Sequence, residues 1–454
     1  MGLTGNATLA GTLAWLATAT LSLALASAAS AADGYDYPIE NPYLATVAGT
    51  PEPLQAQLPK LRIKTRRLPL PADRQIPEVL AYGRKLEYSI AAQRGPAPLI
   101  FAIAGTGGYH NSGTNIGLLK AFHSAGFHVV GISSPTHPKF QIGASSTGVP
   151  GVMDVDGEDL LNVMRRIRTQ LKDKLQVTEY HLTGYSLGGM HAAFVAQRDQ
   201  ANGAEFDFQR VLLINSPVSL YSSISKLDRM LENVPGGVDN FDRYFDGVVR
   251  QISDAYTRST SVEFNQDLVY AAFQANPPTR EDLAAVIGTA FRLSAMNMIF
   301  TADVMSNFGF IKPREQRLPA NADLDAFLQV ALRVGLTDYF HEFVWPFYQE
   351  RYPNLDRERF ADAQSLPAIE TFLRSSPNIF AIHNQDDIIL TGTEIDFFRT
   401  TFGNRAKIYQ RGGHLGNTNH HATVAHMLAV MTNDQVAGQQ AVDTEQSAYG
   451  AGGQ

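Results

Sequence analysis

Three residues capable of nucleophilic chemistry follow apolar runs at widely separated points of the sequence. Ser186 lies at the centre of Gly184-Tyr-Ser-Leu-Gly188, Asp387 comes shortly after an apolar run, and His414 follows two glycines after another run. A serine hydroxyl becomes a useful nucleophile when an imidazole takes its proton, and a carboxylate fixes the imidazole tautomer. These residue types predict acyl chemistry, with Ser186 as nucleophile, His414 as base and Asp387 as acid.

The pentapeptide around Ser186 predicts a sharp turn between a strand and a helix. An apolar-alternating run leads into it, and a helix-like run over 190–197 leads out. Such a turn holds the serine in a strained conformation with its hydroxyl exposed. Positions 184 and 188 are expected to require glycine because neighbouring backbone passes too close to leave room for a Cβ. The N-terminus of the following helix can then stabilise a developing oxyanion.

Strand-like and helix-like runs alternate along most of the chain, which predicts an α/β fold with a mostly parallel sheet and helices on both faces. The expected strands cover 61–68, 85–91, 99–104, 127–132, 179–183, 210–215, 378–383 and 405–410, and the expected helices 115–125, 157–175, 190–197, 393–402 and 418–431. Binding sites in such folds lie outside the carboxyl ends of the strands. Ser186 and the loop Gly105-Thr-Gly-Gly108 both fall at that edge.

The alternation stops over 222–367, where the pattern is helical and rich in Phe, Tyr, Met and Leu. We predict an all-helical cap inserted between two parts of the core, at 32–221 and 368–433. Its aromatic residues form the core of the cap itself or line an apolar substrate pocket on its underside, and the two readings are compatible.

Both ends of the chain differ in composition from the core. Residues 9–32 are uncharged and end in Ala29-Ser-Ala31, which predicts a cleaved signal peptide over 1–31 and export to the periplasm or beyond the cell. No Lys or Arg precedes Lys60, so an uncleaved membrane anchor is the alternative. Residues 33–60 are Pro-rich and are expected to wrap the surface irregularly. The polar tail over 434–454 is expected to be disordered.

Composition excludes several other classes of function. The 454 residues carry a net charge of −7, which gives no basic footprint for nucleic acid, and they include no cysteine. The glycine loop at 105–108 lacks the Lys-Ser/Thr of a nucleotide-binding loop, and the histidines show no metal-ligand spacing. We therefore expect no cofactor, no metal and no membrane span after signal cleavage. No feature of the sequence indicates an oligomeric state.

The order of these motifs resembles the α/β-hydrolase superfamily over residues 61–220 and 377–431. The matching residues are Gly105–Gly108, Gly184–Gly188, Asp387 and Gly412-Gly413-His414. The resemblance implies a serine nucleophile, a cap after the sixth strand, and ester or related acyl chemistry. The N–H of Leu187, which follows the nucleophile, is one expected oxyanion donor. By resemblance, the N–H of Thr106 is the other.

Alternatives exist for the acid and the base. In the family pattern the acid falls three residues after the position of Asn384, which is Asp387, and Asp386 is the alternative. The loop 216–223, where some members carry the acid, has no carboxylate. The rival histidines, which lack the preceding Gly-Gly turn, are His383, His420, His421 and His426. The residues expected to line a substrate pocket are Gly105, Gly107, His110 and Tyr185.

These observations predict an exported serine hydrolase that cleaves carboxylic esters through an acyl-serine intermediate. Its substrate would be a small-molecule or lipid-like acyl compound, with a hydrophobic acyl group suggested by the aromatic cap. The alternatives are a peptidase, thioesterase or acyltransferase that uses the same triad, or a non-catalytic binding protein on a hydrolase scaffold.

Overall fold

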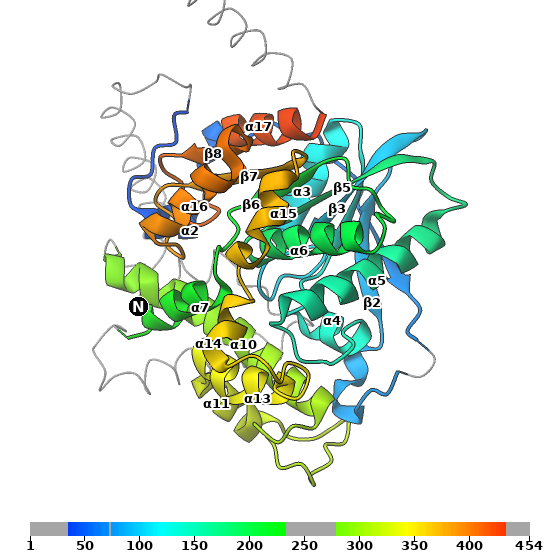
Figure 1. The fold of residues 1–454 in the computed structure, drawn as a ribbon, viewed down its shortest axis with the longest axis vertical. Coiled ribbons are helices and arrows are strands. Elements are labelled where there is room, and N and C mark those ends of the chain that lie inside the picture. The colour runs from blue at the N-terminus through cyan, green and yellow to red at the C-terminus, as the bar shows by residue number, and fades with distance from the viewer. Residues whose placement is uncertain (1–34, 72–73, 233–277, 433–454) are drawn as a thin grey trace, which may run out of the picture.

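The protein is built on one eight-stranded sheet, seen in a computed structural model that describes residues 35–71, 74–232 and 278–432. The strand order is β1-β2-β4-β3-β5-β6-β7-β8 (Figure 1). The strands are β1 Lys64–Leu68, β2 Leu86–Ala91, β3 Ala97–Ile103, β4 His128–Ile132, β5 Val177–Tyr185, β6 Val211–Ile214, β7 Ile379–Asn384 and β8 Ala406–Tyr409. β2 pairs antiparallel with β1 and with β4, and every pairing from β4 to β8 is parallel.

All eight expected strands form, so the predicted fold class is confirmed. The apolar runs become central strands because both of their faces are covered; every residue of β4 and of β6 is buried. The basic strand β1 lies at the edge, where its charged side chains reach solvent. Parallel pairing of β3, β5, β6, β7 and β8 brings their carboxyl ends to one edge of the sheet.

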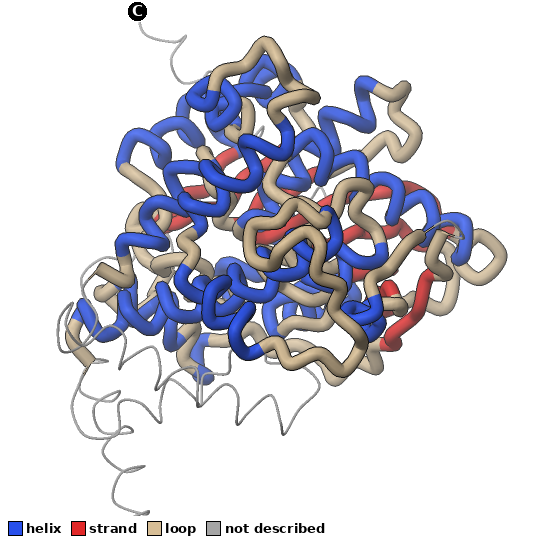
Figure 2. Tube along the Cα trace, turned by 90° about the horizontal axis from the view of Figure 1, so that it is seen from below, coloured by secondary structure: helices blue, strands red, loops and turns tan. Residues whose placement is uncertain are grey.

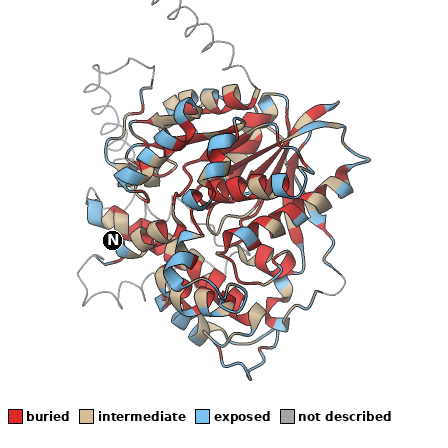
Figure 3. Cartoon of the chain, in the orientation of Figure 1, coloured by how far each residue is buried: buried red, intermediate tan, exposed pale blue. Residues whose placement is uncertain are grey.

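Helices cover both faces of the sheet, as Figure 2 shows. Side chains alternate along β3: Ile100 and Ala102 join a buried cluster with α3 and α17, whereas Leu99 and Phe101 join one with α5 and α6. The buried residues are concentrated in the strands and on the sides of these helices that face the sheet (Figure 3). The covering helices are α3 Gly113–Ser124, α5 Met153–Leu171, α6 Leu187–Ala201, α16 Gly392–Phe402 and α17 His421–Thr432.

Two short helices were not predicted, and both begin at a proline. They are α2 Pro42–Ala48 and α4 Pro138–Gly143. Proline suits the first turn because its missing N–H would have no partner inside the helix. The side chain of Asn41 caps α2 by accepting the N–H groups of Tyr43 and Leu44. The expectation of an irregular segment over 33–60 is therefore wrong at α2.

A helical region is inserted between β6 and β7, and its helices α10, α11, α13 and α14 gather at one end of the molecule in Figure 1. The longest is α10, whose first turn is closed by a capping box between Thr279 and Asp282. The helices are α7 Leu220–Arg229, α10 Arg280–Ser306, α11 Asp325–Arg333, α12 Leu336–Asp338, α13 Trp345–Tyr348, α14 Arg357–Asp362 and α15 Glu370–Ser375. Part of the expected cap, residues 233–277, lies outside the described residues. The limits 222–367 stay a prediction.

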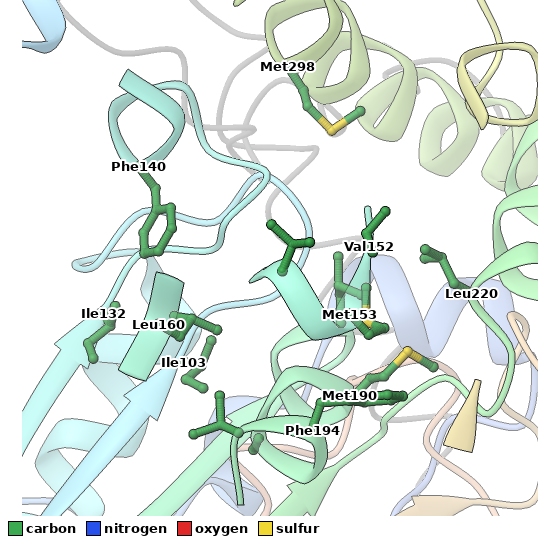
Figure 4. Close-up of a cluster of buried hydrophobic side chains, with 14 of the residues drawn as sticks. Ile103, Ile132, Phe140, Val152, Met153, Leu160, Met190, Phe194, Leu220 and Met298 are labelled. Carbon is green, nitrogen blue, oxygen red and sulfur yellow. The ribbon is translucent and has the colours of Figure 1, made fainter. Parts of the chain in front are cut away.

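The cap and the sheet share one continuous hydrophobic core. In Figure 4, Met298 of α10 points toward the cluster that holds Met153 of α5 and Met190 of α6. Two hydrogen bonds also join the cap to the core. The hydroxyl of Tyr348 donates to the Val149 carbonyl at 2.7 Å, and that of Tyr339 donates to the Pro150 carbonyl at 2.9 Å. The cap is thus packed onto the segment that leads into α5.

The described aromatic residues of the cap pack mainly against one another. The ring of Phe343 is fully buried, with its centroid 4.8 Å from that of Phe308 and 5.3 Å from those of Phe310 and Tyr339. The chain is π-helical over Tyr339–Val344, which carries the rings of Tyr339 and Phe343. Of the two readings of the aromatic pattern, this cluster supports the one in which the rings form the core of the cap.

One described helix, α10, has the length and composition that could cross a membrane, with a mean hydropathy of 1.5 over its most apolar window. However, 67% of that window is buried inside the protein. A core helix meets the same criterion, and the packing of α10 against α11, α4, α2 and α7 accounts for its apolar character.

The aromatic cluster of the cap yields a stability prediction. Phe343→Ala removes a fully buried ring and leaves a cavity, so we expect it to lower the free energy of unfolding by about 3–5 kcal/mol. Urea denaturation followed by circular dichroism measures this loss. Phe347→Ala is the matched control, because Phe347 is only partly buried and its ring centroid is 6.3 Å from that of Phe343. Equal losses for the two variants would contradict the packing described here.

Candidate active site

Ser186 is the single residue between β5 and α6, and its backbone has a conformation that few residues adopt. Its φ is 52° and its ψ is −130°, and its N–H donates to the Ile214 carbonyl at 2.8 Å. A positive φ costs a non-glycine residue free energy, so the surrounding structure must hold it in place. The predicted strained turn is therefore present, with the serine at the carboxyl edge of the sheet.

The glycines on either side of Ser186 are required by close backbone contacts. A Cβ on Gly188 would lie 2.6 Å from the Ala104 carbonyl oxygen, and one on Gly184 would collide with the Gly188 carbonyl. Neither obstacle can move, because each is main chain of a packed element. The expected reason for these two glycines is confirmed.

The structure brings Ser186, His414 and Asp387 together in one hydrogen-bonded chain. His414 Nε2 lies 2.9 Å from Ser186 Oγ, and His414 Nδ1 lies 3.0 Å from Asp387 Oδ2 and 3.1 Å from Oδ1. A carboxylate accepts only, so the Nδ1 proton faces Asp387 and the lone pair of Nε2 faces the serine hydroxyl. All three residues are buried. This is the arrangement in which an imidazole can take the proton of a serine.

Asp387 is held as an ionised carboxylate by its surroundings. Burial by itself raises the pKa of its carboxyl, but electrostatic attraction to the His414 ring and hydrogen bonds from His414 and Asn215 outweigh burial and lower it. Asn215 Nδ2 donates to Oδ2 at 3.0 Å, and the Ile389 N–H donates to Oδ1 at 3.1 Å. The carboxylate is therefore oriented by donors on two sides of the imidazole contact. No pattern in the sequence points to Asn215.

Asp386, the alternative acid, lies elsewhere and has other partners. Its carboxylate accepts the N–H groups of Gly412 at 3.2 Å and Gly413 at 2.9 Å. Burial raises the pKa of this carboxyl, and the two backbone hydrogen bonds oppose the rise. Asp386 thus holds the backbone that precedes His414, whereas Asp387 contacts its ring.

The rival histidine His383 has hydrogen-bond partners other than Ser186. His383 Nδ1 accepts the Asn384 N–H at 3.0 Å, which places its proton on Nε2, 3.0 Å from the Ser216 carbonyl. Burial lowers the pKa of His383, so the ring stays neutral beside Asp387. Burial also lowers the pKa of His426, to about 4.

The two predicted oxyanion donors are the backbone N–H groups of Thr106 and Leu187. A Cβ on Gly105 would lie 3.0 Å from the Cβ of Ser186, so the glycine loop lies directly beside the serine. Within the described residues, the N–H groups of Thr106 and Leu187 donate no hydrogen bond. The Gly107 N–H, by contrast, donates to Thr136 Oγ1 at 2.7 Å. This pattern favours the predicted pair, Thr106 and Leu187.

The two side chains expected in the pocket take different places. Tyr185 lies beneath the glycine loop, and its hydroxyl is 2.8 Å from Ser112 Oγ. His110 is buried with its Nδ1 2.7 Å from Ser89 Oγ, and burial lowers the pKa of the ring to about 4. Tyr185 therefore supports the loop from below, and the contacts of His110 lie with β2 rather than with Ser186.

The cap reaches the glycine loop through a residue that the sequence did not single out. Ser294 of α10 packs so closely on Gly107 that a Cβ there would meet the serine hydroxyl. Gly107 also has a φ of +66°, which disfavours any side chain. α10 therefore lies against the edge of the predicted oxyanion site and brings the hydroxyl of Ser294 to it.

One cluster away from Ser186 has donor types that could hold a metal. Asp36, His420 and His421 each place one ligand atom within 4.8 Å of the others. However, His420 Nδ1 accepts the Ala422 N–H at 3.3 Å, so the proton lies on Nε2, the nitrogen a metal would need. That Nε2 is 3.0 Å from Asp36 Oδ1. We assign the cluster as a close polar contact of the Asp36 carboxylate with the rings of His420 and His421 at the start of α17.

A family model, described as the alpha/beta hydrolase fold, matches residues 98–420. The chain belongs to the α/β-hydrolase fold family. The matched residues run from β3 to the start of α17 and include the whole of the hydrogen-bonded chain from Ser186 to Asp387. A comparison with curated proteins finds no match.

Solved α/β hydrolases and esterases are similar to this chain at low identity. A meta-cleavage product hydrolase from Pseudomonas fluorescens is 12% identical, covering 82% of this chain and 98% of its own, with a TM-score of 0.43. An esterase from Pyrococcus furiosus is 9% identical, covering 82% and 91%, with a TM-score of 0.42. An esterase from Pyrobaculum calidifontis is 14% identical, covering 83% and 85%, with a TM-score of 0.36. At these scores the assignment rests on the family match.

Because the two adjacent aspartates have different partners, we expect replacing each by asparagine to have a different effect. Asp387→Asn removes the charge that fixes the tautomer of His414, so we expect Ser186 to react with a fluorophosphonate probe about 10⁴-fold more slowly. Asp386→Asn keeps an acceptor for Gly412 and Gly413, and we expect a loss of less than about tenfold. Time-resolved labelling measures both rates. A larger loss for Asp386→Asn would reverse the assignment of the acid.

Proposed function

We propose that this α/β hydrolase cleaves carboxylic esters through an acyl-serine intermediate at Ser186. The observation that carries the proposal is the hydrogen-bonded chain from Asp387 through His414 to Ser186 Oγ, with distances of 3.0 and 2.9 Å. Membership of the hydrolase family and the strained turn at Ser186 support it. The roles of the individual residues follow from this geometry.

In the first half of the reaction the serine is acylated. Ser186 Oγ attacks the ester carbonyl carbon while His414 Nε2 takes the hydroxyl proton. The carbonyl oxygen becomes an oxyanion, which accepts hydrogen bonds from the N–H groups of Thr106 and Leu187. When the tetrahedral species collapses, the bond to the alcohol oxygen breaks and the imidazolium returns its proton to that oxygen.

In the second half water regenerates the serine. His414 takes a proton from water, the resulting hydroxide attacks the acyl carbon, and the acid leaves as Ser186 Oγ recovers its proton. Asp387 stabilises the imidazolium in both halves without itself being protonated. Each half therefore uses the same base and the same oxyanion donors.

The position of the cap supports a proposal about the acyl group. α10 packs against the oxyanion loop through Ser294, and the helix is otherwise rich in apolar residues. We place the acyl chain beside this helix and propose an apolar acyl group. The described ring cluster around Phe343 belongs to the core of the cap, so it contributes stability rather than substrate contacts.

A panel of p-nitrophenyl esters of rising acyl length tests the reaction. We expect turnover by the wild-type protein and a loss of kcat of about 10⁶-fold in Ser186→Ala, because the nucleophile is removed while the fold is kept. Ser216→Ala is the control, since Ser216 is also a buried serine at a strand end but bonds only neighbouring main chain. Turnover that survives Ser186→Ala would refute the proposal.

We also propose that the protein is exported with its signal peptide removed. The support is the uncharged segment over 9–32 with its Ala29-Ser-Ala31 ending. Expressed with its own N-terminus in a bacterial host, the exported protein should begin near Ala32 in N-terminal sequencing. Ala31→Leu should block this cleavage. An intact chain of 454 residues held in the membrane fraction would support the anchor instead.

A further inference from the structure

The loop that carries His414 packs directly on α2, an N-terminal helix that precedes the first strand of the sheet. A Cβ on Gly413 would lie 2.6 Å from Thr46 Oγ1, and a Cβ on Gly416 would collide with the Ala45 carbonyl. These two glycines therefore allow the backbone of α2 to approach the loop on either side of His414. The Gly-Gly-His-Leu-Gly pattern serves this contact as well as the turn.

Thr46 makes a specific hydrogen bond within this contact. Its Oγ1 accepts the N–H of His414 at 2.9 Å, and its own hydroxyl proton is donated to the Pro42 carbonyl at 2.7 Å. Because the Pro42 bond fixes the hydroxyl rotor, a lone pair of Oγ1 is aimed at His414. The side chain is thus a pre-oriented acceptor on a helix whose N-terminus is itself capped by Asn41.

The backbone around His414 needs such external support. The φ angles of Gly412 and Gly413 are 144° and 54°, which glycine adopts readily, whereas Leu415 has a φ of 68° that disfavours a side chain. The strained conformation of Leu415 persists only when the surroundings hold it, and the two glycines do not by themselves fix the backbone before His414. Asp386 holds the N–H groups of Gly412 and Gly413, and Thr46 holds the next N–H along the chain. Three successive N–H groups are therefore fixed from outside the loop.

We propose that Thr46 is a positioning residue for His414, so that the N-terminal segment completes the active site of this hydrolase. The proposal rests on the proposed function. Without the Oγ1 acceptor, the N–H of His414 loses its partner and the imidazole can drift from Ser186 Oγ. A displacement of about 1 Å at a reacting group can lower a rate by about 100-fold.

The same segment offers a matched control. Thr50 Oγ1 donates to the Gly416 carbonyl at 2.8 Å, so it bonds the same loop without touching His414. Thr50→Val and Thr46→Val each delete one hydroxyl that joins the segment to the loop, and each keeps the shape of the side chain. A general loosening of the loop affects both variants, and loss of His414 positioning affects only Thr46→Val.

The test compares Thr46→Val, Thr46→Ser and Thr50→Val with the wild-type protein on a p-nitrophenyl ester and a fluorophosphonate probe. We expect Thr46→Val to lower kcat and the labelling rate by about 10- to 100-fold, with KM within about twofold. Thr46→Ser should restore both rates to within about threefold. Thr50→Val should keep kcat within about threefold, and the melting temperatures of the two valine variants report whether their stabilities match.

Two results would overturn the inference: unchanged rates in Thr46→Val, or an equal loss of kcat in Thr46→Val and Thr50→Val. Failure of Thr46→Ser to recover would also count against it, because the serine keeps the acceptor. A wild-type protein without turnover or labelling refutes the proposed function instead, so the two failures are distinct.

Discussion

The hydrogen bond from His414 Nε2 to Ser186 Oγ joins residues that are 228 positions apart. It forms only because β5 and β8 lie in one sheet with their carboxyl ends at the same edge, and because each strand ends at a turn that projects a side chain. The strained φ of Ser186 and the positive φ of Leu415 beside His414 are the local costs of this contact. Packed main chain, glycines and external hydrogen bonds keep both turns in place.

The two adjacent aspartates show how one loop serves both the backbone and the side chain of His414. Asp387 contacts the imidazole, and Asp386 binds the N–H groups of the two glycines before it. With Thr46 on the next N–H, the loop is held by the turn after β7 on one side and by α2 on the other. α2 also contacts α10 through the hydrogen bond from Arg280 to Tyr43, so the cap and the histidine loop share this helix.

The strands could be predicted from the sequence because buried parallel strands appear as continuous apolar runs. Ser186, Asp387 and His414 could be predicted because each of them lies in the turn that follows such a run. The helix α2 could not be predicted, because seven residues are too few to show a helical periodicity in the sequence. A helix of this length is stabilised mainly by tertiary contacts. Thr46 could not be predicted either, because it binds a backbone N–H, and every residue except proline carries such a group. Asp386 and Asp387 are neighbours of the same type, and only the geometry separates their roles.

The central claim is that Ser186 Oγ is a nucleophile activated by His414. Peptide mapping by mass spectrometry after an acid quench of the protein with a slowly deacylating ester tests this claim most directly. The account predicts one acyl group on the peptide that contains Ser186, and none on that peptide in His414→Ala. An acyl group on another residue, or no adduct while the ester is turned over, would contradict it.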